Sequence, residues 1–261
     1  MKILAVLAGY NESSIILHVL QHLVDNYIDT FYIDNGSTDG TLELVKRSGL
    51  CIDAISLPRN DNKYEWRKIL QRKESIYDGF ENKYDWFMHH DCDEFRYSPY
   101  PGMTLAQAIC HVDDMEYTAI DHVLFDMQLT ENVAEGDDPR GKLIYCKPPE
   151  KHRNFQVKTW KNTGSGVNIS KHGGHWPIMD DLDICLRPFV MAHYPLRNVV
   201  QAKRKVFEER LPCYIHEEHK VLAWHEPWDE YKADPNKSFV ADPKNLYQFS
   251  LQKARYYCRS I

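Results

Sequence analysis

The sequence predicts an α/β fold with a mostly parallel sheet and helices on both faces of that sheet. In the first hundred residues, short β-rich runs alternate with segments whose apolar residues recur at helical spacing. Polar loops with the sequences "GYNE", "DNGSTDG" and "DCDE" each follow one of these runs. Because the carboxyl ends of parallel strands open on one edge of a sheet, we expect the three loops to lie together there.

The first two units each consist of a strand followed by a helix. The run "ILAVLAG" predicts a buried strand, and the helical spacing that follows predicts a helix capped by Ser13 or Ser14. The run "FYI" predicts the second strand. After a glycine-containing turn, a second helix is expected to run from about Thr41 to a stop near Gly49.

The alternation continues to about Pro101 and then weakens. We expect a strand in 51–57, a helix over 64–80 and a strand over 84–91, and farther on a helix in 104–112, strands in 117–129 and a loop over 130–142. We therefore divide the chain into residues 1–110, which carry the ligand loops, and residues 111–261, a C-terminal extension of the same domain. This second half is where an acceptor or partner would be selected.

Composition narrows the possible classes of protein. A chain of 261 residues with 43% hydrophobic content can bury the core of one large domain, or of a domain with an appendage. The net charge of -6 gives no general attraction to nucleic acid, although Lys203, Arg204 and Lys205 could form a local basic patch.

The cysteines and the apolar runs bear on localisation. Seven cysteines without a CxxC pair argue against a disulfide framework or a structural zinc site and favour a reducing cytoplasm. No apolar run reaches the length of a membrane span, and "YNESS" stands where a signal peptide would have its cleavage site. We expect a cytoplasmic protein, and peripheral attachment to the inner face of a membrane stays open.

The stretch "WFMHHDCDEF" places Asp91 and Asp93 directly after a predicted strand. Carboxylates so close together repel each other unless a positive charge lies between them, and Mg²⁺ or Mn²⁺ held there would take further ligands from substrate phosphates. On the pattern alone, a solvated acidic turn is an equal alternative. The position after a strand favours the metal site.

As an ordered set, "AGYNES", "YIDNGSTDGT" and "DWFMHHDCDEF" resemble the loops of family 2 glycosyltransferases of the GT-A fold, which is Rossmann-like. Farther on, "VKTWKNTG", "GGHW", "RPFVMAHYPLR", "KRKVFEER" and "AWHEPWD" resemble strings of a bacterial branch of that family. The resemblance implies a nucleotide-sugar donor and a glycan or lipid-linked acceptor. It also implies roles for the matching residues. Tyr10, Asn11 and Glu12 fall on a first loop that lies against the nucleotide, and Asp34 falls on the position that contacts the base. Asp91 and Asp93 match a DxD motif, whose first carboxylate lies near the ribose and whose last holds the metal on the diphosphate.

The mechanism implied by the resemblance is direct displacement at the anomeric carbon with inversion, assisted by a base beyond the DxD motif. Our candidates for this base are Asp180 and Asp181, with Asp121 behind them. His175, which follows two glycines, is the favoured additional metal ligand, ahead of His172 and His193. Any of these histidines could equally be a packing or surface residue.

Other interpretations stay open from the sequence. A nucleotidyltransferase could use the same sheet and carboxylate pair, although the chain has no glycine-rich basic loop near its start. A carbohydrate-binding protein that has lost turnover is a further possibility. Tryptophans could stack on sugar rings or simply pack in the core, and the candidates are Trp160, Trp176, Trp224 and Trp228.

Overall fold

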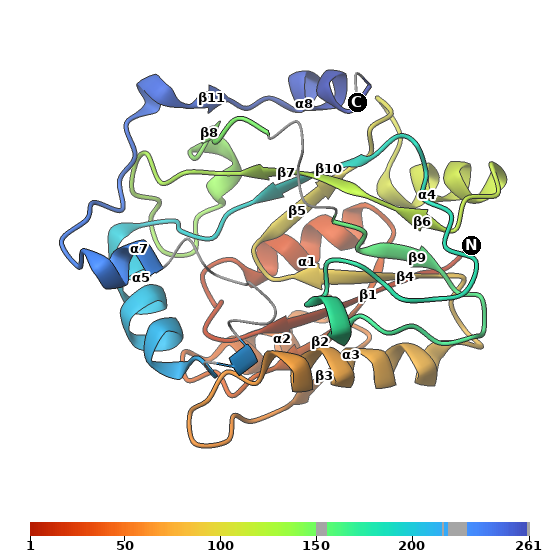
Figure 1. The fold of residues 1–261 in the computed structure, drawn as a ribbon, viewed down its shortest axis with the longest axis horizontal. Helices are drawn as coiled ribbons and strands as arrows, with labels where there is room; N and C mark the ends of the chain where they lie inside the picture. The colour runs from red at the N-terminus through yellow and green to blue at the C-terminus, as the bar shows by residue number, and fades with distance from the viewer. Residues whose placement is uncertain (150–155, 216, 219–228, 260–261) are drawn as a thin grey trace.

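The structure is a computed structural model that describes residues 1–149, 156–215, 217–218 and 229–259. Its centre is a six-stranded sheet in the order β3-β2-β1-β4-β9-β6 (Figure 1). The four strands from β3 to β4 are parallel, and β9 runs antiparallel to β4 and β6. The strands are β1 (Ile3–Gly9), β2 (Asp29–Asp34), β3 (Asp53–Ser56), β4 (Trp86–Asp91), β6 (Ala119–Ile120) and β9 (Thr159–Lys161). The predicted mostly parallel sheet is confirmed, and the arrangement is consistent with a GT-A, Rossmann-like fold.

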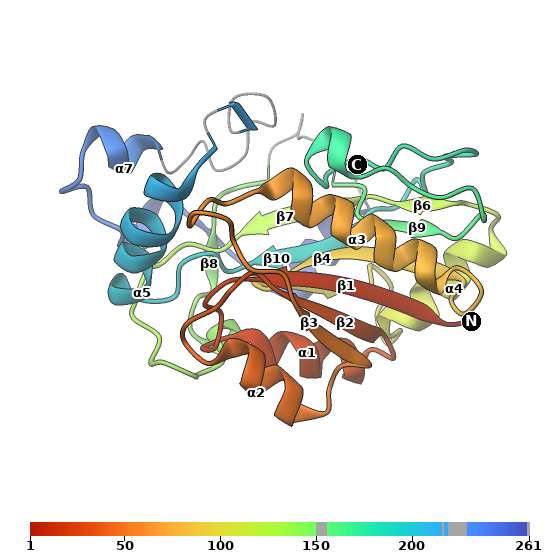
Figure 2. The ribbon, with the colours of Figure 1, turned by 90° about the horizontal axis from the view of Figure 1, so that it is seen from below.

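Helices cover both faces of this sheet, as predicted. The helices are α1 (Ile16–Asp25), α2 (Thr41–Ser48), α3 (Trp66–Phe80) and α4 (Leu105–Asp114). Figure 2 shows α3 on one side of β1, β2 and β3, and α1 and α2 on the other. In β1, Leu7 belongs to the same apolar cluster as Leu20 of α1, whereas Leu4 and Val6 cluster with Ile69 of α3. Because successive side chains of a strand point to opposite faces, a strand covered on both sides is apolar throughout.

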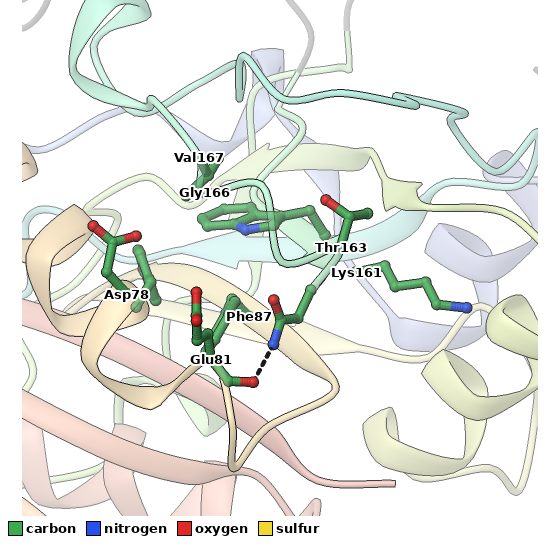
Figure 3. A pocket seen from close by; sticks show the side chains of 10 residues that line it. Asp78, Glu81, Phe87, Lys161, Thr163, Gly166 and Val167 are labelled. Atoms are coloured by element: carbon green, nitrogen blue, oxygen red, sulfur yellow. Dashed lines mark hydrogen bonds between the residues drawn. The ribbon is translucent and has the colours of Figure 1, made fainter.

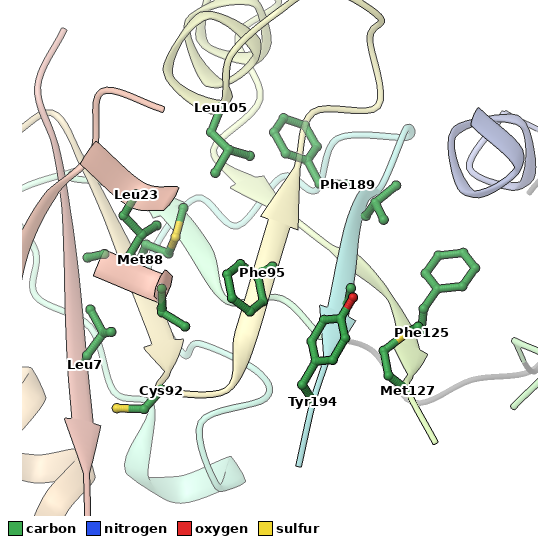
Figure 4. Packing of buried hydrophobic residues seen from close by; sticks show 14 of the residues in the cluster. Leu7, Leu23, Met88, Cys92, Phe95, Leu105, Phe125, Met127, Phe189 and Tyr194 are labelled. Atoms are coloured by element: carbon green, nitrogen blue, oxygen red, sulfur yellow. The ribbon is translucent and has the colours of Figure 1, made fainter. Parts of the chain in front are cut away.

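A three-stranded sheet lies beside the central one and extends the core. Its order is β5-β10-β7, with β5 at Glu94–Tyr97, β10 at Phe189–His193 and β7 at His122–Asp126. Figure 4 shows apolar side chains filling the space from Leu7 and Met88 of the central sheet to Phe125 of β7. Phe95 and Tyr194 meet there edge to face, with ring centroids 5.5 Å apart. The core therefore runs without interruption from the first strand to the second half of the chain.

The remaining elements are short. They are β8 (Tyr145–Cys146), β11 (Tyr247–Gln248), α5 (Val199–Lys203), the π-helix η3 (Arg204–Arg210), α7 (Asp229–Ala233) and α8 (Leu251–Tyr257). Because β6 and β9 come from the second half of the sequence, the two predicted halves share one sheet. No helix in the described part of the chain is both long enough and apolar enough to cross a membrane. All seven cysteines lie in this part and are free.

Two helix starts differ from the prediction. Helix α1 has Ile15 at its N-cap and no side-chain cap, because the hydroxyl of Ser14 accepts a hydrogen bond from Arg197 instead, at 3.1 Å. Helix α3 begins at Trp66, because Tyr64 forms a β-bridge with Tyr214. In both places a contact with the second half of the chain overrides the helix start that the local sequence predicts. The predicted end of α2 is confirmed by Gly49, which adopts φ 67°.

Buried His22 predicts a loss of stability in mild acid. Its Nε2–H donates to the carbonyl oxygen of Arg96 at 2.7 Å, and burial lowers its pKa to about 4. The folded protein therefore binds this proton more weakly than the unfolded chain does, so stability is present above the unfolded pKa and falls as the pH drops toward 4. We expect this group to cost about 3 kcal/mol of unfolding free energy between pH 6.5 and pH 4.

The measurement is urea unfolding across that pH range for the wild type, His22→Gln and His172→Gln. Glutamine keeps an N–H donor but does not titrate, so His22→Gln should flatten the profile, whereas the exposed control His172→Gln should not. Parallel profiles for the wild type and His22→Gln would contradict the assignment.

Candidate functional site

The loops after β1 and β2 are bound tightly to each other. Gly9 ends β1 at a point where a Cβ atom would lie 2.6 Å from the Tyr32 hydroxyl, so only glycine fits without displacement. Next to it, Asn11 has φ 56°, and its side-chain oxygen accepts a hydrogen bond from the amide of Thr38 at 2.8 Å. The Asn11 amide in turn donates to the Ser37 hydroxyl at 3.0 Å. The two predicted ligand loops are thus one connected surface.

Asp34, at the end of β2, is buried and only half satisfied. One oxygen, Oδ2, accepts hydrogen bonds from the amides of Gly36 at 3.0 Å and Ser37 at 2.9 Å, which closes the turn. The other oxygen, Oδ1, is buried and has no hydrogen-bond partner among the described residues. A buried acceptor without a donor is costly, so this atom is suited to a donor from a bound ligand.

The DxD carboxylates are paired with lysines from the second half of the chain. Lys158 lies 2.8 Å from Asp91 and 2.6 Å from Glu94, and Lys205 lies 2.8 Å from Asp93 and 3.0 Å from Glu12. Both lysine side chains are at most 4% exposed. The acidic cluster after β4 is therefore a neutralised network in which Asp93 and Glu94 are buried and Asp91 is 28% exposed, and the solvated-turn alternative does not describe it.

These pairs set the protonation of the two aspartates. Burial by itself would raise the pKa of Asp91, but the ammonium group of Lys158 outweighs burial and holds that pKa well below its usual value. Burial likewise opposes ionisation of Asp93, and Lys205 and His193 together bring its pKa well below the usual value. Both carboxylates are thus charged at neutral pH and able to act as oxygen ligands.

His193, at the end of β10, lies between two carboxylates. Its Nε2 is 3.5 Å from Oδ1 of Asp93, and its Nδ1 is 3.0 Å from Oδ1 of Asp126. Burial lowers the pKa of His193, but Asp93 and Asp126 outweigh burial and raise it to about 10. Metal-binding histidines commonly bind a second carboxylate through the ring nitrogen that does not face the metal. His193 has this arrangement, with Nε2 facing Asp93 and Nδ1 bound to Asp126.

The donor set fits a divalent cation that takes several of its ligands from substrate. Asp93 and His193 would hold it, with a proton displaced from Nε2 of the histidine. Within the described residues, no group of three or more His, Cys, Asp or Glu side chains is placed to hold a metal ion. A cation held by these two residues would therefore need its remaining ligands from water or a bound substrate.

A cavity of about 460 Å³ opens over the loops after β1 and β4, and the loop after β2 adjoins it without lining it. The cavity volume is within the usual range for small-ligand sites. Its lining combines charged and apolar side chains. The charged residues at and near the DxD motif include Glu12, Asp91, Asp93, Lys158 and Lys205, with Arg210, and the apolar residues include Leu124, Met127, Leu129, Met191, Leu196 and Phe239.

A second cavity lies between the end of α3 and the loop after β9 (Figure 3). Its volume of about 20 Å³ has room for little more than a water molecule. Trp160, a candidate for stacking on a sugar, lines this cavity and is 2% exposed, so its environment is that of a core residue. Two other candidates, Trp224 and Trp228, lie outside the described residues.

The candidates for the base are not placed in the large cavity. Asp180 and Asp181 are exposed, and neither lines it. Asp121 is 4% exposed, and its Oδ1 accepts from the amides of His122 and Gln156 at 2.8 Å each. It acts as a structural acceptor behind the site. Among the described residues, the acidic side chains that line the cavity besides Glu12 and the cluster at 91–94 are Asp126 and Glu230.

His175 lines the cavity but does not contact either DxD aspartate. Its Nδ1 hydrogen-bonds to the side-chain oxygen of Gln156 at 2.9 Å, and burial lowers its pKa to about 4, so the ring is neutral. The glycines before it serve another residue, because a Cβ at Gly174 would lie 2.6 Å from Nε2 of His89. Of the histidines, it is His193 that lies beside Asp93.

Sequence reasoning missed the cations of the site. Lys205 was assigned to a possible surface patch, but its ammonium group is buried against Glu12 and Asp93. Lys158 and Arg210 were not predicted as site residues at all. The available signal was indirect: these residues stand in or beside the strings "VKTWKNTG" and "KRKVFEER". The π-helix that carries Lys205 and Arg210 is an element typical of functional sites.

No protein-family model and no curated protein sequence matches the chain. Among solved structures, it is similar to HddC from Yersinia pseudotuberculosis, with 6% identity over 78% of this chain and 97% of that chain and a TM-score of 0.35. It is also similar to a glycosyltransferase involved in the glycosylation of the major capsid of PBCV-1, with 11% identity over 99% and 100% of the two chains and a TM-score of 0.28. Likeness at this level does not support an argument about function, which therefore rests on the geometry of the chain itself.

The buried lysine pairs predict a large effect of one substitution. Lys205→Met removes the cation from two buried carboxylates, and we expect it to lower the free energy of unfolding by about 3–5 kcal/mol. The matched control is Lys142→Met, because the pair of Lys142 with Asp137 is 44% and 50% exposed and should contribute less than about 1 kcal/mol. Urea unfolding measures both, and equal losses would show that the buried network does not hold the fold together.

Proposed function

We propose that this protein is a glycosyltransferase that moves a sugar from a nucleoside diphosphate sugar, with UDP the first nucleotide to test, to a glycan or lipid-linked acceptor. The observation that carries the proposal is the convergence of three strand ends. The loops after β1, β2 and β4 bring Glu12, Asp34, Asp91 and Asp93 to one edge of the sheet. Ligands of open α/β sheets bind at this edge.

The nucleotide is assigned to the side of the cavity near β1 and β2. Oδ1 of Asp34 is a buried acceptor with no donor among the described residues, which suits a base N–H. Tyr10 and Asn11 lie in the adjoining loop, and Glu12 lines the cavity itself. The resemblance to family 2 glycosyltransferases assigns these positions to the nucleotide, and the half-satisfied Asp34 is independent support.

The proposal includes a divalent cation, Mn²⁺ or Mg²⁺, at the DxD motif. Asp93 and His193 are the residues that would hold it, with Asp126 orienting the imidazole and Asp91 alongside. When bound, the cation would stabilise negative charge on the departing diphosphate. Lys158 and Lys205 fix the carboxylates in place through their other oxygens.

The acceptor is assigned to the apolar part of the cavity lining. Asp126 and Glu230 also line the cavity, and they are the acidic side chains able to take the acceptor proton in a direct displacement with inversion. Seven free cysteines favour a cytoplasmic setting, at the inner face of a membrane where the acceptor is lipid-linked.

Nucleotide binding tests the donor assignment. We expect UDP, or one of the alternatives GDP and dTDP, to bind in calorimetric titration with Mn²⁺, and Asp93→Asn to weaken that binding by about tenfold or more. The exposed control Asp180→Asn should bind as the wild type does. If none of the three nucleotides binds, or if the protein releases pyrophosphate from a nucleoside triphosphate, the proposed function is wrong.

Turnover of the donor tests the base. Hydrolysis of the nucleotide sugar that binds can be followed for Asp126→Asn, Glu230→Gln, Asp180→Asn and Asp181→Asn. Loss of the base should lower the rate by about 10²–10⁴-fold in one of the first two variants and leave UDP binding with Mn²⁺ unchanged. Because Asp126 also contacts His193, a rate loss in Asp126→Asn that comes with weaker UDP binding reflects that contact and not the base. Asp180→Asn and Asp181→Asn should keep full activity, and at Asp181, where φ is 56°, asparagine is readily tolerated. A large loss of hydrolysis rate in Asp180→Asn or Asp181→Asn would instead identify that exposed aspartate as the base.

A further inference from the structure

Two arginines beside the cavity have buried N–H groups that bind nothing in the described part of the chain. Arg210 is 7% exposed, and both its Nε and its Nη1 are buried without a hydrogen-bond partner there. Arg59 donates through Nε to Asn35 at 3.0 Å, but its Nη1 and Nη2 are likewise buried and without partners. Unsatisfied donors on a buried cation carry a large free-energy cost, so they call for an explanation.

Tyrosine rings hold the two guanidinium groups near each other. The guanidinium carbon of Arg59 lies 3.4 Å from the ring centroid of Tyr10 and 5.3 Å from that of Tyr64. The guanidinium carbon of Arg210 lies 4.5 Å from the centroid of the same Tyr64 ring. Burial lowers the pKa of Arg59, and the charge of Arg210 lowers it further, which is the repulsion expected of two neighbouring cations.

The nearby carboxylates do not hydrogen-bond to this pair. Glu12 is bound by Arg197 at 2.8 Å and by Lys205 at 3.0 Å. Glu209 accepts from the side chain of Asn11 at 2.8 Å and lies 3.0 Å from Nε of Arg204. Burial lowers the pKa of Arg210, but Tyr64, Glu12 and Glu209 outweigh burial and raise it, so the guanidinium group is charged. Because both acids are bound to other groups, the unpartnered N–H donors of Arg59 and Arg210 are left for a ligand.

We propose that Arg210, which lines the cavity, forms with the support of neighbouring Arg59 a binding site for the diphosphate group of a substrate. Guanidinium groups present paired N–H donors that match phosphate oxygens. Arg210 lines the same cavity as Asp91 and Asp93, and its π-helix also supplies Lys205. Tyr10 and Tyr64 keep the arginines fixed in place, so that they do not have to reorganise when the anion binds.

A diphosphate could reach this site from either substrate of the proposed transfer, on which this inference rests. The donor carries one between nucleoside and sugar, and a lipid-linked acceptor carries one between lipid and glycan. The site is defined by the chemistry that both share. Which source it serves is decided by the probes.

Calorimetric titration of inorganic pyrophosphate, UDP, uridine and geranyl diphosphate tests the site, with EDTA and again with Mn²⁺. We expect pyrophosphate to bind the wild type, and Arg210→Gln to weaken that binding on the order of 10–100-fold. Arg59→Gln should act in the same direction. Uridine has no phosphate, so its binding should be the same in all variants.

The matched control is Arg187→Gln. The guanidinium carbon of Arg187 lies 4.4 Å from the ring centroid of Tyr100, and this arginine does not line the cavity, so the variant should bind pyrophosphate as the wild type does. A loss of affinity for UDP in Arg210→Gln assigns the site to the donor, and a loss for geranyl diphosphate assigns it to the acceptor. Either result supports the diphosphate site.

Melting temperatures without ligand separate binding from a structural role. Because no described residue hydrogen-bonds to Nε or Nη1 of Arg210, we expect the melting temperature of Arg210→Gln to stay close to that of the wild type. A wild type that does not bind pyrophosphate, or an Arg210→Gln variant that binds it equally well, would overturn the inference. Binding of pyrophosphate that needs Arg210, without binding of any nucleoside diphosphate, would support the site and reject the proposed donor.

Discussion

The structure depends on the neutralisation of acids from the first half of the chain by cations from the second half. Glu12, Asp93 and Glu94 are buried, and isolated charges cannot remain buried at this depth. Lys158 and Lys205 each bridge two carboxylates, and their sequence separations from the DxD motif are 67 and 112 residues. The loops at the sheet edge can therefore adopt their buried form only when the second half has folded over them.

This dependence explains why the sequence predicted one part of the site and not the other. Strand positions followed from apolar periodicity, and the loop after β2 followed from turn residues such as Asp34, both of which are local properties. The partners of these loops are tertiary. Nothing near Lys205 in the sequence indicates that it lies against Glu12, and Ser14 has the features of a helix cap although its hydroxyl accepts from Arg197.

The histidines show the same limit in another form. The glycines before His175 made it the favoured additional metal ligand, but in the structure the ring of His89 occupies the place that a Cβ atom at Gly174 would take. His193 had no distinguishing neighbour in the sequence. Its significance comes from β10, which pairs with β5 and β7 so that His193 ends up between Asp93 and Asp126. Sheet pairing brings these residues together although they are far apart in the sequence, and a single sequence does not specify that pairing.

The charge balance of the cavity links the proposed ligands to one another. Before any ligand binds, each carboxylate of the DxD motif already has a lysine beside it. Arg59 and Arg210, in contrast, have buried N–H groups without a hydrogen-bond partner among the described residues. A metal ion entering alone would add positive charge to a site that has no surplus of negative charge. A diphosphate supplies that negative charge and also satisfies the arginine donors, so each ligand reduces the cost of binding the other. By neutralising these carboxylates, the buried lysines would make the proposed cation and anion bind as a pair.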